Sequence, residues 1–197
     1  MEIRTLTLGI YQTNTYFLVQ NKQVIIIDPV SKSERIYALL KEDEEIIGIC
    51  LTHGHFDHIG AVDELVNISK CPVFVHQDDY ELTQDSEKNY SQSKKIKLKS
   101  KLSFYSDHMR LGTFEFNVFH TPGHTKGSVC LEFNDSLFTG DTLFKGSIGR
   151  TDLYGGSDQE MKQSLRFIRS LKENYTIYPG HEEQTNLFYE LKHNPYL

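Results

Sequence analysis

The chain has 197 residues, a length that fits one globular domain over 1–197 with a core of its own. Its net charge of -6, from 21 Lys and Arg against 27 Asp and Glu, argues against a dedicated nucleic-acid binder, which would need a large basic face. No apolar run approaches the ~20 residues of a membrane-spanning helix, and no signal peptide is evident, so we expect neither nucleic acid nor membrane as a partner.

The three cysteines, Cys50, Cys71 and Cys130, are odd in number and show no C-x-x-C spacing. Two of them lie inside apolar runs, which is typical of small buried hydrophobic residues. We expect free thiols in a reducing, cytoplasmic compartment, with no cysteine acting as metal ligand or nucleophile.

The first half of the chain reads as short strands with crossover helices. Short β-branched and aromatic runs between polar turns predict strands, and apolar residues at helical spacing predict helices. Asp28-Pro29 ends the third strand, because proline cannot continue a ladder. The expected strands are 3–8, 15–19, 24–27, 46–51 and 72–75, and the expected helices are 33–41 and a second from 57 or 58 to 67.

The second half continues the same pattern after a polar, aperiodic segment over 82–93, which we expect to be a mobile loop. The lysine-rich run 94–101 alternates charge with apolar residues and predicts an edge strand protected by lysines, with an anion-attracting rim as the alternative. Two sheets packed together, with helices on their outer faces, are expected. The strands are 98–105, 114–120, 128–133, 137–139 and 176–178, and the helices are 157–171 and one from about 182.

The strongest chemical signal is an H-x-H-x-D-H run where a buried strand ends and a helix begins. It comprises His53, His55, Asp57 and His58, with Gly54 expected to let the backbone bend. Three imidazoles and a carboxylate within six positions can converge on a small volume, which is typical of a metal site.

Three later turns have the same form, each a strand end followed by one potential ligand. They are Thr121-Pro122-Gly123-His124, Thr139-Gly140-Asp141 and Pro179-Gly180-His181. One such turn alone would be a weak signal. On successive strand ends after an H-x-H-x-D-H run, the three together indicate a shared site.

This set of motifs, from Asp28 to His181, resembles the metallo-β-lactamase superfamily. Asp141 and the lack of a cysteine ligand are similar to the glyoxalase II (hydroxyacylglutathione hydrolase) branch and not to the B1 β-lactamases. The resemblance implies an α/β fold of the αββα sandwich type, with two mixed β-sheets and helices on the outer faces. It also implies one metal ion on His53, His55 and His124, a second on Asp57, His58 and His181, and Asp141 bridging the two.

Five imidazoles and two carboxylates are too many ligands for one tetrahedral ion but suit two divalent ions that share a carboxylate and a water. We expect Zn²⁺ first, with iron or manganese as alternatives. A bridging hydroxide formed at neutral pH would attack a thioester carbonyl, with Asp57 and Asp141 as the carboxylates of the catalytic centre. The resemblance implies a small-molecule hydroxyacyl-thiol substrate of the lactoylglutathione type, cleaved by a metal-dependent thioesterase.

Two residues outside the ligand set have two interpretations each. Asp28 recurs in the resembled family beneath the metal site, where it would orient a ligand histidine, but an Asp-Pro turn alone could also explain it. Arg150, in the element Gly149-Arg150-Thr151-Asp152, is a candidate for gripping a substrate carboxylate or for a structural pair with Asp152, and we favour the pair.

The likeness to full-length glyoxalase II becomes weaker after His181. Those enzymes continue into a helical domain, whereas the sixteen residues that follow His181 here resemble the short, single-domain branch. One alternative is a persulfide dioxygenase with one ferrous ion on His53, His124 and Asp141. Another is a non-catalytic metal-binding or regulatory module. The sequence leaves the oligomeric state open. Four histidines match no motif position and are expected at the surface or in structural roles: His76, His108, His120 and His193.

Overall fold

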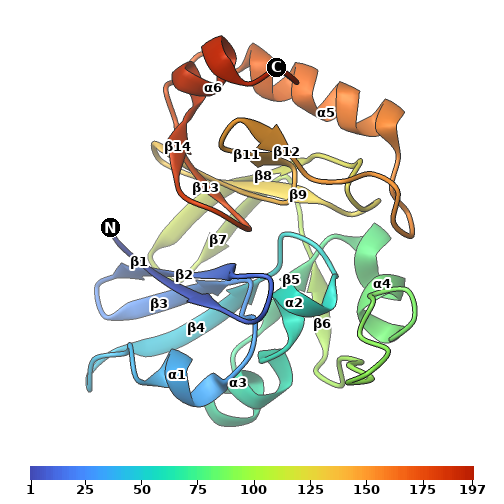
Figure 1. Ribbon diagram of the computed structural model, residues 1–197. Helices are drawn as coiled ribbons and strands as arrows, with labels where there is room; N and C mark the ends of the chain where they lie inside the picture. Colours follow the sequence, from blue (N-terminus) through green and yellow to red (C-terminus); the bar gives the residue numbers. More distant parts are fainter.

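The computed structural model describes residues 1–197 and shows two six-stranded sheets packed face to face, with helices on both outer faces (Figure 1). The first sheet is antiparallel from β1 to β3 and parallel from β3 to β6, so it is mixed, as expected. Its strands, in spatial order, are β1 (Glu2–Leu8), β2 (Thr13–Gln20), β3 (Gln23–Ile27), β4 (Glu45–Cys50), β5 (Val73–Val75) and β6 (Leu102–Phe104).

The second sheet has the order β14-β13-β10-β9-β8-β7 and is also mixed, because only the β10–β13 pair is parallel. Its strands are β7 (His108–Leu111), β8 (Phe114–His120), β9 (Val129–Phe133), β10 (Ser136–Gly140), β13 (Thr176–Pro179) and β14 (Thr185–Asn186). A small ribbon of β11 (Leu143–Phe144) and β12 (Ser147–Ile148) follows β10.

The helices cover the outer faces of the two sheets (Figure 1). The longest, α5, starts at Ser157, whose hydroxyl accepts a hydrogen bond from the Glu160 amide, and it buries Met161, Leu165 and Ile168 at helical spacing. No helix combines the length and the apolar character that crossing a membrane requires. The helices are α1 (Ser33–Tyr37), α2 (Phe56–Ile59), α3 (Val62–Ser69), the 3-10 turn η1 (Gln77–Asp79), α4 (Tyr80–Gln84), α5 (Asp158–Ser170) and α6 (Leu187–His193).

Three apolar layers hold the sandwich together. Alternating residues of β3 show the division, since Ile26 faces the helices α1 and α3 while Ile25 and Ile27 face the second sheet. The third layer lies between the second sheet and α5, and includes Leu137 and Ile177. The expected fold class, a two-sheet sandwich with outer helices, is confirmed.

The helix expected over 57–67 is wrong in detail, because it is two helices, α2 and α3, with a break at Gly60 and Ala61. Here the chain packs against the turn after β3: a Cβ on Gly60 would lie 2.1 Å from the Val30 carbonyl oxygen, and the Ala61 amide donates to the Pro29 carbonyl. The last helix begins at Leu187, not near 182, where Glu182 has a left-handed φ of 66° that breaks a helix.

The expected edge strand over 94–101 is also wrong, since the edge strand β6 begins only at Leu102. Side chains satisfy the backbone of this run in place of a ladder: Asn89 and Ser91 bind the Ile96 backbone, and the Asp63 carboxylate accepts from the Lys99 amide. The segment 82–93, expected to be a mobile loop, starts inside the helix α4, which runs to Gln84. The apolar pattern of the run does not show these side-chain contacts, which come from residues 5 to 36 positions away.

A partly buried ion pair anchors the turn before β4, and its contribution to stability is predicted to depend on pH. The two terminal guanidinium nitrogens of Arg4 donate hydrogen bonds of 2.6 and 2.7 Å to the Glu44 carboxylate and lower its pKa to about 2. We expect Glu44→Gln to lower the free energy of unfolding by about 1–3 kcal/mol at pH 7, because Arg4 loses the more buried of its two carboxylate partners, Glu44, and keeps only Glu2.

The contribution of a carboxylate whose pKa is depressed on folding is present above its ordinary pKa of 4.5, and it is lost as the pH falls through about 2. Urea unfolding at pH 7 and pH 3 measures this difference, which we expect to shrink at the lower pH. The exposed Glu42→Gln is the matched control. Equal stability of Glu44→Gln and wild type at pH 7 would contradict the prediction.

Candidate metal centre

The predicted ligands lie together because they follow strands that end at the same edge of the sandwich. His53 follows β4 of the first sheet, and His124, Asp141 and His181 follow β8, β10 and β13 of the second. Their donor atoms fall into two groups, His53 with His55 and His124, and Asp57 with His58 and His181, in which the atoms lie within 4.8 Å of one another. The structure therefore brings together all seven residues that the motifs single out.

The separations between the donor atoms fit ligands that share an ion. Two ligands about 2.0–2.1 Å from one tetrahedral zinc ion lie about 3.4 Å apart. Asp141 Oδ1 is 3.4 Å from His58 Nε2, and Asp141 Oδ2 is 3.4 Å from the Nε2 atoms of both His124 and His181. His124 and His181 belong to different groups, so Asp141 lies beside ligands of both groups.

The outer ring nitrogens of four histidines are hydrogen-bonded, which sets their tautomers. Nδ1 of His58 donates to Asp28, Nδ1 of His124 to the Arg150 carbonyl, and Nδ1 of His181 to the Tyr11 carbonyl. Nδ1 of the fourth, His53, lies 3.1 Å from the Thr52 hydroxyl, which itself donates to Asp28. Nε2 is then the nitrogen of each ring that faces the cluster, and that of His124 also lies 2.9 Å from His55 Nδ1.

Several of the free atoms are buried without a partner. These are Nε2 of His53, His55 and His58, together with Oδ1 of Asp141. A buried polar atom without a hydrogen bond costs free energy, and a bound cation would recover that cost. Nitrogen and carboxylate donors without sulfur suit Zn²⁺, Fe or Mn, so the residues fit a divalent metal centre.

Burial and neighbouring charge set the protonation of the cluster. Burial lowers the pKa of His53 and His55 well below its usual range, and the neighbouring imidazoles lower it further, so both rings are neutral at pH 7. Burial also lowers the pKa of His58, but Asp57, Asp141 and Asp28 outweigh it and raise the value to about 10. The carboxylates therefore create a negative site that attracts cations.

Asp28 lies beneath the ligands, and its side chain makes hydrogen bonds that an Asp-Pro turn alone would not need. Its carboxylate is 1% exposed and accepts from His58 Nδ1 at 2.9 Å, the Thr52 amide at 2.8 Å and the Thr52 hydroxyl at 2.6 Å. It thereby orients His58 directly and His53 through Thr52. This geometry supports the interpretation that Asp28 orients a ligand histidine.

Sequence analysis missed a second buried carboxylate, Asp79 in η1, which joins two ligand loops. It is 1% exposed and accepts from the Gly54 amide at 2.8 Å, the Thr125 hydroxyl at 2.8 Å and the Gly127 amide at 2.7 Å. Burial raises the pKa of Asp79, and these three donors oppose that rise. No motif marks this residue, because its partners belong to loops far apart in the sequence.

Gly54 has a different role from the one expected. Its φ is not in the left-handed region, so the turn does not need glycine for its dihedral angles. A Cβ at this position would instead lie 3.0 Å from the Leu82 Cβ, so the small residue lets the ligand loop approach α4 closely.

A cavity of about 400 Å³ opens onto the metal ligands, and Arg150 lies on its rim. The guanidinium binds Asp152 through two hydrogen bonds, of 2.6 and 2.7 Å, while both side chains remain mostly exposed. The structure thus contains the favoured pair with Asp152, and the Arg150 backbone carbonyl orients His124. Tyr11, Phe56 and Tyr90 form aromatic walls of the cavity.

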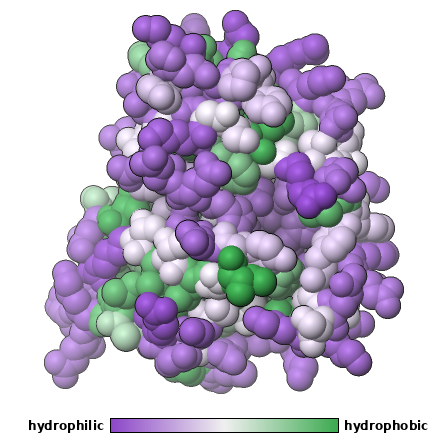
Figure 2. All heavy atoms as spheres, viewed as in Figure 1, coloured by the Kyte–Doolittle hydropathy of each residue, from purple (hydrophilic) through white to green (hydrophobic).

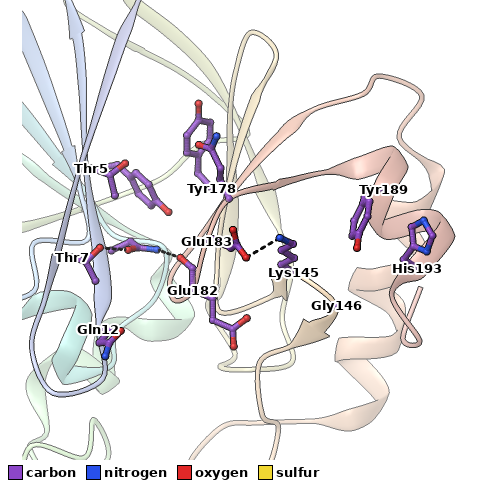
Figure 3. A pocket seen from close by; sticks show the side chains of 13 residues that line it. Thr5, Thr7, Gln12, Lys145, Gly146, Tyr178, Glu182, Glu183, Tyr189 and His193 are labelled. Carbon is purple, nitrogen blue, oxygen red and sulfur yellow. Dashed lines mark hydrogen bonds and ion pairs between the residues drawn. The ribbon is translucent and has the colours of Figure 1, made fainter.

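A larger cavity, of about 890 Å³, lies away from the ligands between the edge strands of the two sheets (Figure 3). Its polar groups are bound to one another: Lys145 pairs with Glu183 at 2.8 Å, and Asn14 donates to the Pro179 and Glu182 carbonyls. Asn14 thereby fixes the turn that carries His181 to the first sheet. The sequence did not single out Asn14.

The four histidines outside the motifs lie away from the ligand cluster. His76 and His120 stack with ring centroids 4.0 Å apart, and His120 Nε2 donates to the Lys126 carbonyl. His108 contacts Glu115 and Asn117 at the surface, and His193 stacks on Tyr189. All three cysteines are buried and free, and burial raises the pKa of each thiol.

Comparison with known proteins decides the family. The family model of the "Metallo-beta-lactamase superfamily" matches residues 8–181, which include all the predicted ligands. The chain belongs to the metallo-β-lactamase superfamily. It is 36% identical to the "Probable metallo-hydrolase YqgX" of Bacillus subtilis, over 100% of this chain and 98% of that protein.

Two solved structures agree with this assignment. The BLEG-1 B3 metallo-β-lactamase is 36% identical, with a TM-score of 0.93 over 100% of this chain and 99% of that one. TTHA1623, solved in a di-iron-bound form, is 34% identical, with a TM-score of 0.89 over 98% of this chain and 100% of that one. Membership in the superfamily and the His/Asp cluster together support a metal-dependent hydrolase.

Proposed function

We propose that this superfamily member is a dinuclear metal-dependent hydrolase that cleaves small-molecule thioesters of the hydroxyacyl-thiol type. The observation that carries the two-metal assignment is the position of Asp141 Oδ2, 3.4 Å from His124 of one ligand group and from His181 of the other. A single-ion site would leave Asp57, the buried His58 and the half-buried His181 as a second ligand group without an ion.

His53, His55 and His124 would hold one divalent ion, and Asp57, His58 and His181 the other. The ions would supply Lewis acidity toward the substrate carbonyl and an ionised water as nucleophile at neutral pH. The chain itself orients these ligands through Asp28, Thr52 and the Arg150 and Tyr11 carbonyls.

The cavity walls suit a thioester. Tyr11 and Phe56 meet edge to face with centroids 5.9 Å apart, and Tyr90 packs against His55, so the substrate would lie between aromatic rings that exclude water. A thiolate leaves with a pKa of about 8.5, so it needs little help from an acid. Thioester hydrolysis at this site therefore requires neither a separate general acid nor a Ser or Cys nucleophile.

Metal content per chain and hydrolysis test this function together. Protein expressed with zinc, iron and manganese all available, and purified without chelator, is expected to hold about two ions per chain. It is expected to hydrolyse lactoyl-thiols, followed by release of free thiol, and to lose this activity with a chelator. Two ions without thioesterase activity would leave the metal assignment standing and overturn the substrate class.

The same samples separate the other candidates. One iron per chain, with oxygen uptake in the presence of a persulfide, would favour the dioxygenase, which needs only His53, His124 and Asp141. Hydrolysis of a chromogenic cephalosporin in preference to thioesters would favour a β-lactamase, the activity named for one similar structure. Bound metal with no turnover of any of these would favour a regulatory module.

A further inference from the structure

A second cavity, of about 740 Å³, continues from the metal cavity toward α1. The two cavities share four lining residues, Tyr11, Phe56, Asp57 and Tyr90, so a substrate bound at the metal ligands can extend from one into the other. The metal cavity alone is only about 400 Å³. The second cavity therefore provides the room for the arm of a larger substrate.

The charged side chains that line this second cavity are mostly cationic. They are Lys32 and Arg35 at the start of α1, Lys94 in the lysine-rich run, and Asp57, whose carboxylate faces Thr13 and His181. No carboxylate lies within 4.0 Å of the three cationic groups, although six other Lys and Arg side chains of the protein have such partners. In a chain of net charge -6, three unpaired cations in one cavity form a local site for an anion.

The uncharged walls of this cavity include apolar side chains that suit an uncharged linking chain. Leu8, Val30 and Ile96 contribute aliphatic surface. Ile10 at the β1–β2 turn is 87% exposed, and Tyr11 beside it is 56% exposed. Figure 2 shows a hydrophobic patch in the lower half of this face, beside hydrophilic side chains, where Figure 1 places this turn. An arm that carries both apolar and anionic groups matches these surfaces.

We propose that the cavity formed by Lys32, Arg35 and Lys94 binds the anionic end of the thiol arm of the substrate. The substrate would then be a thioester whose leaving thiol carries carboxylate or phosphate groups. This inference rests on the proposed thioesterase function, and it gives the lysine-rich run a role that an edge strand would not have. Of the lysines in the run 94–101, only Lys94 lines the cavity, so Lys97 lies outside it.

Three substrates with the same acyl group test the inference. S-lactoylglutathione has a carboxylate arm, lactoyl-coenzyme A has a phosphate arm, and S-lactoyl-N-acetylcysteamine has a neutral arm. In the triple variant Lys32→Ala, Arg35→Ala, Lys94→Ala, we expect KM for an anionic-arm substrate to rise about tenfold. The reason is that the variant loses three exposed charge interactions, each of modest size. We expect kcat, and both constants for the neutral-arm substrate, to stay within twofold of wild type.

The matched control is Lys97→Ala, which removes the same charge from the same run outside the cavity. An effect on glutathione alone would identify carboxylate, an effect on coenzyme A alone would identify phosphate, and an effect on both would identify a general anion site. Equal changes for anionic and neutral arms, or an effect of Lys97→Ala as large as that of Lys94→Ala, would overturn the inference.

Binding of the free thiols separates this inference from the proposed function. Titration calorimetry with glutathione and with coenzyme A is expected to show binding that weakens with salt and that falls about tenfold in the triple variant. If no thioester is hydrolysed but this loss of binding is seen, the thioesterase function fails and the anion site stands. If wild type binds neither thiol, or the variant binds as well as wild type, the anion site is overturned.

Discussion

The Asp141→Asn variant is expected to retain at most about one metal ion per chain and to lose at least a hundredfold in turnover. The physical reason is that Asp141 contacts both ligand groups, and its two oxygens lie 3.4 Å from His58, His124 and His181. An amide has no negative charge and only one oxygen, so it cannot neutralise two ions at once. Loss of a residue that merely orients a ligand already costs ten- to a hundredfold, so loss of a shared ligand costs more.

Elemental analysis and thioester hydrolysis, measured on the same preparation, check this expectation. Asp135→Asn is the matched control, because it makes the same change in the exposed turn before β10, the strand that Asp141 follows. It is expected to leave metal content and activity unchanged. Two ions per chain with full activity in Asp141→Asn would overturn the bridging role.

Asp79→Ala is expected to lower the free energy of unfolding by about 3 kcal/mol or more, and Tm by about 6–12 °C. The substitution removes the acceptor of the buried Gly54 and Gly127 amides, and it leaves the Thr125 hydroxyl with Ser128 Oγ as its remaining partner. Gly54 lies between His53 and His55, and Thr125 follows His124, so the affinity for metal is expected to fall as well.

Asp79→Asn is expected to recover part of this loss, because its one oxygen can still accept from two of the three donors. Asp78→Ala, in the same turn but with its side chain 46% exposed, is expected to change stability by no more than about 0.5 kcal/mol. Thermal unfolding of the three variants, with and without added zinc, measures both effects. If Asp79→Ala and Asp78→Ala unfold at the same temperature, the buried carboxylate does not join the two ligand loops.

Local patterns predicted the elements whose signals lie within a few residues. The apolar run over 46–51 and the helix over 157–171 match β4 and α5 closely, since burial on both faces of a strand and helical amphipathicity are visible in sequence. The run 94–101 and the last helix were mispredicted. Their conformations depend on Asp63, Asn89 and the left-handed turn at Glu182, which the local pattern does not reveal.

The sequence by itself determined the ligand types and their positions at strand ends, because the chemistry of a metal site restricts which residues can serve and a turn after a strand brings them to one edge. The tertiary structure decided what supports and surrounds the ligands: the contact of Asp28 with His58, the tie that Asp79 makes between two loops, and the gathering of Lys32, Arg35 and Lys94 around one cavity. These residues lie up to tens of positions apart with no common spacing. Only the packing of two sheets and their loops brings them within contact distance, so no pattern along the chain could have revealed them.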